Sequence, residues 1–396
     1  MTRTGSPGEV FRAFLRLGLT SFGGPIAHLG YFRDELVTRR RWLGDREYGD
    51  LVALAQFLPG PASSQVGFAL GLLRAGPLGA LAAWAAFTLP SAILLVAFAY
   101  GASLFDNTIG AGMLAGLKIV AVAIVAQAVW GMARTLTPDA RRASIAVGAA
   151  VIALVLAGSV GQVAAIAVGA VAGLALCRTA DQPDRVDLAF PVSKRAGVVA
   201  LAVFAVLLIG LPIAAAATGI AALDVADAFY RAGALVFGGG HVVLPLLDAE
   251  VVTGGWITPE QFLAGYGAAQ AVPGPLFTFA AYLGALLAPG AAGLATAAIA
   301  LVAIFVPGLL ILIGVLPFWN AVRTRPAAQA LMRGANAAVV GILAAALYDP
   351  VFVTAVVDAP SFALALVCFV LLVAWRVPPW VVVIVGAAGG ILLTLL

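Results

Sequence analysis

Charge is scarce in this sequence of 396 residues: Asp, Glu, Lys and Arg make up 10% of it, whereas 63% of the residues are hydrophobic. An ordinary soluble protein is about 25% charged. Runs of roughly 20 apolar residues recur from end to end, and each is long enough to cross a hydrocarbon layer about 30 Å thick. The composition predicts an all-α integral membrane protein and leaves no segment for a soluble domain.

Metal ligands and disulfide partners are equally scarce. The sequence holds two cysteines, Cys177 and Cys368, and two histidines, His28 and His241. They form neither a disulfide framework nor a zinc motif, so no metal or cofactor is expected. The sequence also lacks the Gly-x-Ser-x-Gly and His-Glu-x-x-His motifs, which makes an intramembrane enzyme the least favoured class. The net charge of +4 comes from scattered Lys and Arg, which indicates topology signals and no nucleic-acid partner.

Hydropathy divides the chain into thirteen apolar segments, six in each half and one between. No cleavable signal peptide is expected, because residues 1–9 are polar and Arg12 and Arg16 interrupt the first apolar run. We predict a first repeat at 1–178, a linker with an odd transmembrane helix at 179–222, and a second repeat at 223–396. The predicted segments are about 10–31, 48–73, 77–105, 109–133, 143–157, 160–177, 197–219, 225–247, 259–288, 291–318, 328–347, 360–375 and 378–396.

The two halves share residues at a nearly constant offset, which indicates an internal duplication. Arg16 and Arg231 are 215 positions apart (231 − 16), as are Lys118 and Arg333. Two pairs of motifs follow the same spacing. The glycine motifs contain Phe22, Gly23 and Gly24 in the first half and Phe237, Gly238 and Gly239 in the second, and the Pro-Gly-Pro motifs are Pro59-Gly60-Pro61 and Pro273-Gly274-Pro275, preceded by Gln56 and Gln270.

The odd segment between the halves predicts that the second repeat is inverted in the membrane, as in many secondary transporters. Lys118, Arg231 and Arg333 lie within apolar runs, and the other 19 of the 22 Lys and Arg lie between or beside them. All 19 fall on one side if the first two segments of each half are re-entrant hairpins that break at their Gly-Gly and Pro-Gly-Pro motifs. The positive-inside rule therefore favours nine crossings and four re-entrant hairpins over thirteen crossings.

The glycine motifs predict breaks inside apolar helices, because glycine costs a helix about 1 kcal/mol relative to alanine. Non-helical backbone at membrane depth is tolerated only where protein or a watery cavity covers it. Freed N–H groups and a half-helix N-terminus could then bind an anion, although close helix packing is the alternative. The duplication favours a site formed by Gly23, Gly24, Gly238, Gly239 and the adjacent His241.

The Pro-Gly-Pro motifs place polar side chains beside a second pair of breaks, because two prolines remove donors and interrupt the helix. Gly60 and Gly274 are the flexible positions of these motifs. The neighbouring side chains could donate to a tetrahedral anion or could merely satisfy carbonyls freed by the break. These candidates are Gln56, Ser63, Ser64, Gln270 and Thr278.

Four basic residues in or beside apolar runs are candidates for anion binding: Arg16, Lys118, Arg231 and Arg333. A cation at mid-membrane costs about 2.5–3.5 kcal/mol. We find no acid beside them to offset this cost, whereas an anionic substrate would. Snorkelling to a headgroup is the alternative. The acids near segment ends are interpreted as solvated ends or caps, and they are Glu35, Asp50, Asp227, Glu250 and Glu260.

With these residues in view, the sequence resembles the long, two-domain form of the chromate ion transporter family. The resemblance is carried by FGGP after an N-terminal Arg, a basic loop ending in Trp42, QFLPGP, and the second copies RAGALVFGGGHVVLP and AQAVPGP. It implies export of chromate across the plasma membrane, with sulfate as the isosteric competitor or physiological substrate. One departure is that the second glycine motif reads FGGGH, which predicts unequal contributions from the halves.

Two other functions remain open from the sequence. A lipid-phosphate flippase would also combine re-entrant hairpins with buried arginines, and an anion channel would need a continuous pore. The expected partners are chromate or sulfate and the lipid bilayer, and a homodimer is left open. The residues do not define the coupling ion or the direction of transport.

Overall fold

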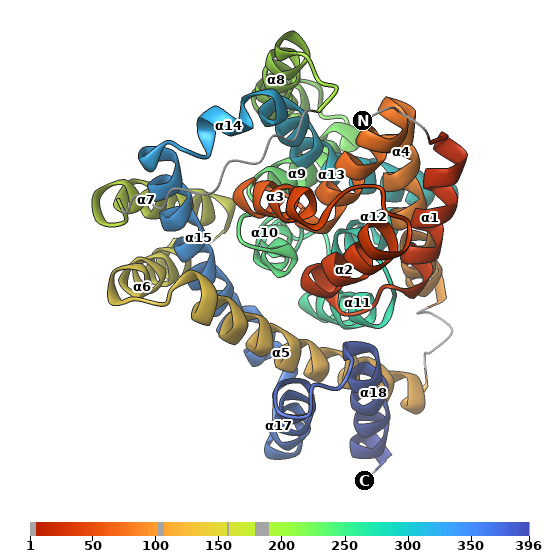
Figure 1. The fold of residues 1–396 in the computed structure, drawn as a ribbon. Helices are drawn as coiled ribbons and strands as arrows, with labels where there is room; N and C mark the ends of the chain where they lie inside the picture. The colour runs from red at the N-terminus through yellow and green to blue at the C-terminus, as the bar shows by residue number, and fades with distance from the viewer. Residues whose placement is uncertain (1–4, 102–106, 157, 179–189, 396) are drawn as a thin grey trace.

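The computed structural model describes residues 5–101, 107–156, 158–178 and 190–395, and within them every regular element is a helix (Figure 1). Most of the predicted linker, residues 179–189, and the first four residues of the polar N-terminus lie outside the described residues. The predicted all-α class is confirmed, because long apolar runs in lipid satisfy their backbone groups only as helices or closed barrels.

The first half contains helices α1 to α7, and α8 (Lys194–Thr218) separates it from the second half. The first-half helices are α1 (Pro7–Thr20), α2 (Gly24–Phe32), α3 (Asp45–Phe57), α4 (Ala62–Gly101), α5 (Thr108–Leu136), α6 (Ala140–Val155) and α7 (Gly158–Leu176). The second half contains α9 (Ala221–Ala234), α10 (Val243–Leu247), α11 (Pro259–Ala271), α12 (Phe279–Leu286), α13 (Gly290–Val315), α14 (Trp319–Val322), α15 (Pro326–Ala346), α16 (Val353–Ala355), α17 (Ala359–Val373) and α18 (Pro379–Leu395).

Short helical turns connect several of these helices. Three are π-helical, at η1 (Arg33–Arg39), η4 (Asp248–Val252) and η7 (Leu347–Phe352), and three are 3₁₀ turns, at η3 (Gly240–Val242), η5 (Leu276–Thr278) and η6 (Leu316–Phe318). The turns η1 and η4 stand at equivalent places after the two glycine motifs.

Six helical stretches among the described residues are long and apolar enough to cross a bilayer, so the chain is a multi-pass membrane protein. They are Ala62–Gly101, Thr108–Leu136, Gly158–Leu176, Lys194–Thr218, Gly290–Val322 and Pro326–Ala355. Three shorter apolar helices accompany them: Leu276–Leu286, Ala359–Val373 and Pro379–Leu395. The predicted inversion and the re-entrant hairpins concern the position of the bilayer and stay predictions.

The helices end where the two glycine motifs predict breaks. Between α1 and α2, Gly23 and Gly24 have φ values of 100° and 79°, and between α9 and η3, Gly238 and Gly239 have values of 73° and 141°. Side chains with a Cβ rarely adopt these conformations, which explains why glycine stands there. The Pro-Gly-Pro motifs likewise separate α3 from α4 and α11 from η5.

Helix α4 consists of two antiparallel arms. Its backbone leaves the helical region at Ala75 and Gly76, and beyond this turn Gly79 packs directly on Gly71, with no room for a Cβ on either residue. Small residues allow such close backbone approach within a membrane. The first arm runs from the Pro-Gly-Pro motif to the turn, and the second arm is long enough to span the bilayer.

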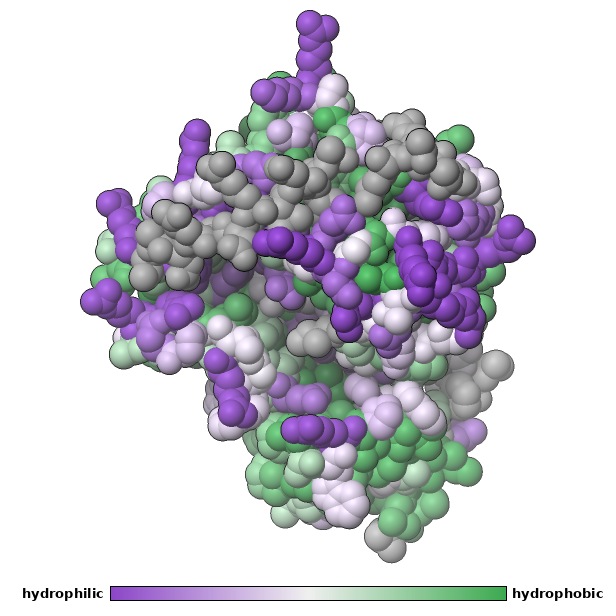
Figure 2. All heavy atoms as spheres, viewed as in Figure 1, coloured by the Kyte–Doolittle hydropathy of each residue, from purple (hydrophilic) through white to green (hydrophobic). Residues whose placement is uncertain are grey.

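Helices α9 to α13 lie centrally in Figure 1, with α1 and α4 at the right, α6 and α7 at the left, and α2 and α3 drawn over the centre. Helix α15 packs against α6 and α7, and α5 carries α17 and α18 on its outer side. In the same view, hydrophilic side chains gather over α1 to α3, whereas mostly hydrophobic ones cover α17 and α18 (Figure 2). The broken segments of the second half therefore lie centrally, whereas those of the first half reach the surface in this view.

Candidate functional site

Each Pro-Gly-Pro motif is bonded to the glycine motif of the other half. The Gly60 N–H donates to the Val236 carbonyl at 2.7 Å, and the Gly274 N–H donates to the Ser21 carbonyl at 2.9 Å. Ser21 and Val236 directly precede the two glycine motifs and occupy equivalent positions of the duplication. The two hydrogen bonds are equivalent in the duplication, and they bring the four predicted breaks together. We call this place the crossing; it consists of residues 21–25, 59–61, 236–241 and 273–275.

The two glycine motifs face each other at the crossing. A Cβ on Gly24 would lie 3.8 Å from His241 Nε2, and a Cβ on Gly240 would lie 3.0 Å from Pro25 Cγ. The Pro-Gly-Pro turns are tighter still. A Cβ on Gly60 would lie 2.9 Å from the Gly308 Cα, so glycine alone permits this approach.

A Cβ on Gly274 would lie 2.8 Å from Ser91 Oγ and 3.2 Å from the Phe87 carbonyl oxygen. Ser91 and Gly308 each follow a proline inside a long helix, at Pro90 in α4 and Pro307 in α13. Each Pro-Gly-Pro turn therefore packs against the residue that follows a helix proline in the other half.

Four helical segments begin at the crossing, directly after the breaks. They are α2 at Gly24, α4 at Ala62, η3 at Gly240 and η5 at Leu276. No side chain caps the start of α2, η3 or η5. The first N–H groups of a helix lack partners within the helix and carry a partial positive charge. The crossing therefore holds free backbone N–H groups at these helix starts, and the carbonyl ends of α1, α3, α9 and α11 lie at the same breaks.

His28 is fully buried on α2 beside the first Pro-Gly-Pro motif. Its Nδ1 lies 3.4 Å from Ser63 Oγ, and its ring meets Phe87 edge-on with centroids 5.3 Å apart. Its Nε2 makes no hydrogen bond of good geometry with the described residues, although the Ser21 backbone lies next to the ring. The imidazole thus joins α2 to α4 and keeps one polar atom unsatisfied.

His241 begins a second polar chain on the opposite side. Its Nδ1 lies 2.9 Å from the Tyr266 hydroxyl, and Tyr266 also interacts with the Gln270 side chain. Tyr266 is fully buried and Gln270 is nine-tenths buried. This chain leads from the facing glycine motifs to the second Pro-Gly-Pro motif.

Several buried groups that can donate hydrogen bonds have no partner among the described residues. An unsatisfied buried polar group costs about 1–3 kcal/mol. Such groups are therefore rare unless a ligand or a water molecule forms a hydrogen bond with them. Four of them lie in the segments that form the crossing or next to them: Ser21 Oγ, His28 Nε2, Ser64 Oγ and Thr88 Oγ1. Two unsatisfied acceptors, Gln65 Oε1 and Asn336 Oδ1, lie beside them. An acceptor-rich ligand would satisfy the four donors.

The structure brings together most, but not all, of the predicted polar residues. Ser63, Ser64 and Gln270 are buried at the crossing, whereas Gln56 is exposed on α3. The Thr278 hydroxyl donates to the Pro275 carbonyl at 2.7 Å and so satisfies an acceptor that the break frees. Gln56 and Gln270 therefore occupy equivalent sequence positions but different environments.

Gln65 is a residue that the sequence reasoning missed. Its side chain is fully buried, and its Nε2 donates to the Pro59 and Gly308 carbonyls at 2.9 Å each. It therefore fastens the first Pro-Gly-Pro motif to α13 of the other half. The signal was available, since an amide stands in an otherwise apolar run one turn after Pro61.

The interpretation of Arg231 as unpaired is wrong. Its Nη2 lies 2.9 Å from Asp227 Oδ2 and 2.9 Å from Glu250 Oε2. Asp227 stands one helical turn earlier in α9, and η4 returns Glu250 to α9. Glu250 also accepts a hydrogen bond from Ser159 at 2.7 Å. These acids are partners of the arginine, not the solvated ends that their places in the sequence suggested.

The other predicted cations are dispersed. Arg16 is exposed on α1 and makes no ion pair with the described residues. Lys118 is half-buried within α5. Arg333 donates to the Cys177 carbonyl at 3.2 Å, beyond the end of α7. Asp50, interpreted as a solvated end, instead forms a buried ion pair with Arg323.

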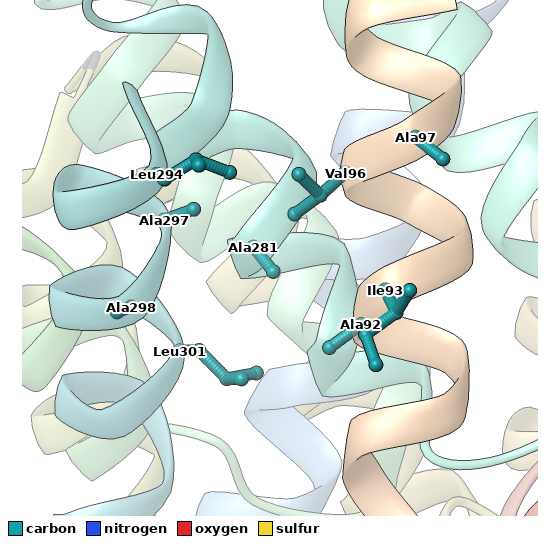
Figure 3. A pocket seen from close by; sticks show the side chains of 9 residues that line it. All are labelled: Ala92, Ile93, Val96, Ala97, Ala281, Leu294, Ala297, Ala298 and Leu301. Atoms are coloured by element: carbon teal, nitrogen blue, oxygen red, sulfur yellow. The ribbon is translucent and has the colours of Figure 1, made fainter. Parts of the chain in front are cut away.

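Two cavities lie away from the crossing. The first, of about 380 Å³ between α4, α12 and α13, is lined by alanine, valine, isoleucine and leucine side chains, so it offers no polar group to an ion (Figure 3). The second, of about 300 Å³, is lined by Asp248 and Asp349 and would repel an anion. The crossing is therefore the candidate site for an anionic ligand.

Broken helices that meet inside a helical membrane protein are typical of secondary transporters. The chromate transporter family matches this chain twice, over residues 8–174 and 223–391, and the chain belongs to that family. It is therefore an ion transporter and not an enzyme. The two matches agree with the duplication read from the sequence.

Named relatives cover nearly the whole chain. A chromate transport protein from Cupriavidus metallidurans is 30% identical over 95% of this chain and 90% of its own length. One from Pseudomonas aeruginosa is 29% identical over 96% and 90%. A probable chromate transport protein from Synechococcus elongatus is 27% identical over 97% and 95%. No solved structure matches the chain.

Proposed function

We propose that this protein exports a tetrahedral oxyanion, chromate in the first place, from the cell through the plasma membrane. Sulfate, which has the same shape and charge, would compete or would serve as the physiological substrate. Chromate is the substrate named for the relatives in Cupriavidus and Pseudomonas, and it enters here as part of the proposal.

The observation that carries the proposal is the excess of donors at the crossing. Four buried donors there have no partner among the described residues, and three helix starts have no side-chain cap. A tetrahedral oxyanion presents four oxygens that accept hydrogen bonds from several directions. Binding would therefore replace several unsatisfied donors with charge-assisted bonds, which are about twice as strong as neutral ones.

Backbone N–H groups would supply direct contacts to the anion. Each helix N-terminus is equivalent to roughly half a positive elementary charge, and four helical segments begin at the crossing, where four others end. Arg231 already forms ion pairs with two carboxylates. We therefore assign it to positioning α9 and η4 rather than to direct contact with the anion. Arg16 remains a candidate for attracting the anion from the surface.

Transport would proceed by alternating access between two inverted repeats, residues 1–178 and 223–396. In this proposal nine helices cross the membrane, and four broken pairs are re-entrant, so that each pair enters and leaves the membrane on the same side. The pairs are α1 with α2, α3 with the first arm of α4, α9 with α10, and α11 with α12. The reciprocal bonds of Gly60 and Gly274 support it, because each repeat then holds half of the site.

Uptake of labelled chromate into inverted vesicles tests the proposal. Sulfate, and more weakly molybdate, should inhibit uptake at fixed ionic strength. Phosphate should compete poorly, because its P–OH donor would face a site that offers mainly donors. Counterflow stimulated by internal sulfate distinguishes a carrier from a channel. No inhibition by sulfate, or strong inhibition by a neutral or cationic solute, would overturn the oxyanion proposal in favour of a lipid flippase.

A further inference from the structure

Helix α15 brings a polar side chain to the second glycine motif. The helix packs against η3 and α10 as well as against α6 and α7. A Cβ on Gly238 would lie 3.7 Å from Oδ1 of Asn336, which stands on this helix. The two atoms still nearer to that point belong to Leu136 and Met132 of α5, which are apolar. Asn336 is therefore a polar group at the edge of the crossing, on a helix outside it.

The Asn336 amide makes no hydrogen bond with the described residues. Its Oδ1 is buried, although the residue as a whole is only half-buried. A buried amide oxygen without a donor is unfavourable, because folding has removed the water that would bond it. Gln65 also has an unsatisfied oxygen, but its Nε2 is held by the Pro59 and Gly308 carbonyls. The Gln65 amide is therefore fixed, whereas the Asn336 amide is free to turn.

The first half has no counterpart to this side chain. The equivalent position, 215 residues earlier, is Ala121 (336 − 215). A Cβ on Gly23 would have no polar atom of the described residues within 4 Å. Gly240 also has an N–H where the equivalent residue, Pro25, has none. The second glycine motif is therefore the more polar of the two, and it is the place where the crossing can discriminate among oxyanions.

An amide that is free to turn suits the recognition of an oxyanion. Its nitrogen donates two hydrogen bonds, its oxygen accepts them, and a half-turn exchanges the two. Toward a fully ionised oxyanion, whose oxygens only accept, Asn336 would present Nδ2. Four unsatisfied donors already lie at the crossing. An oxyanion without an O–H therefore finds a partner for each of its oxygens, whereas an O–H would occupy a place that offers donors.

We propose that Asn336 is a specificity-determining residue, whose Nδ2 donates to the bound oxyanion beside the second glycine motif and so favours oxyanions that carry no O–H. This inference rests on the proposed function, because it assigns a further contact to the same ligand. Asp has nearly the shape of Asn, but its carboxylate only accepts hydrogen bonds and adds a negative charge. At this position it would repel a fully ionised oxyanion and would accept a hydrogen bond from one that keeps an O–H.

Equilibrium binding of labelled sulfate and of labelled phosphate to the purified protein in detergent tests this role. The pH is held where phosphate is mainly the monohydrogen dianion, so that only phosphate carries an O–H. Asn336→Asp should weaken sulfate binding roughly 10- to 100-fold, as expected for the loss of a hydrogen bond to a charged group. Phosphate binding should weaken much less, so the ratio of phosphate to sulfate affinity should rise. Asn336→Ala removes the amide without adding charge and should weaken both anions by a similar factor.

Asn320→Asp on α14 is the matched control, because Asn320 is exposed and lies outside the crossing. Both affinities should be unchanged in this variant. An unchanged ratio of phosphate to sulfate affinity in a folded Asn336→Asp variant would overturn the specificity role alone. If that variant does not fold, wild-type sulfate affinity in Asn336→Ala would overturn it equally. Wild-type protein that binds neither sulfate nor chromate would instead refute the proposed function.

Discussion

At the scale of single residues, the site is defined by donors without partners more than by charged side chains. Ser64 and Ser21 are buried and unsatisfied, whereas Thr278 already bonds a carbonyl. Polar residues with similar sequence surroundings therefore have opposite roles. The unsatisfied serines should therefore contribute to anion binding, whereas Thr278 should contribute to stability.

Ser64→Ala should weaken oxyanion binding without destabilising the protein. A hydrogen bond to a charged group contributes about 1.5–3 kcal/mol, which corresponds to a loss of roughly 10- to 100-fold in affinity. The melting temperature in detergent should hold or rise, because an unsatisfied hydroxyl is removed. The matched control is Ser144→Ala on α6, whose hydroxyl donates to Ala140 far from the crossing. Unchanged chromate affinity in Ser64→Ala would remove this serine from the site.

Arg231→Ala should act through stability. The substitution leaves Asp227 and Glu250 side by side without their counter-charge. Breaking a buried ion pair costs about 3–5 kcal/mol, and we expect roughly 2 kcal/mol because the arginine side chain is 35% exposed. Thermal unfolding in detergent measures the loss, and adding Glu250→Gln should restore part of it. Full stability with abolished transport would return Arg231 to direct substrate contact.

At the scale of elements, the function depends on where helices stop. The first arm of α4, α2, η3 and η5 all begin at a break, and each break needs a glycine whose backbone meets another segment. The low helix propensity of glycine and proline explains why the helices are interrupted. The hydrogen bonds of Gly60 and Gly274 explain why the interrupted ends stay together. The two Pro-Gly-Pro turns are therefore the joints between the repeats.

Gly274→Ala should disrupt this joint and abolish transport of every oxyanion together. The added methyl would lie 2.8 Å from Ser91 Oγ at a φ of 104°. Gly255→Ala is the matched control, because its φ is 74° and nothing lies within 4 Å of the added methyl. Both variants carry backbone strain of about 1–2 kcal/mol, but only the first loses the crossing. Equal uptake rates for the two variants would show that the joint is not needed.

At the scale of the whole molecule, the proposed inversion can be measured directly. Single cysteines at Thr38 and Thr253, both exposed, should label from opposite faces of the membrane in a background lacking Cys177 and Cys368. An odd number of crossings between the halves requires this result. Labelling of both from one face would refute the inversion. Labelling of Thr38 from outside would refute the re-entrant hairpins and leave the duplication intact.

The class of fold, the duplication and the positions of the helix breaks could all be predicted from the residues alone. Composition and the hydropathy pattern can be read from neighbouring residues in the chain. Glycine and proline act on the backbone at their own positions. The Gly-Gly and Pro-Gly-Pro motifs could therefore be identified as breaks before any contact was known. The family resemblance rested on the same motifs, and the comparisons with known proteins confirmed it.

Which residues contact each other depends on how the helices pack. The bond from Gly60 to Val236 joins positions 176 apart (236 − 60), and no local pattern encodes such a pairing. The same holds for Glu250, which η4 returns to Arg231, and for Gln65, which reaches Gly308. Side-chain partners depend on how whole helices pack, which is why Arg231 looked free in the sequence and is paired in the fold.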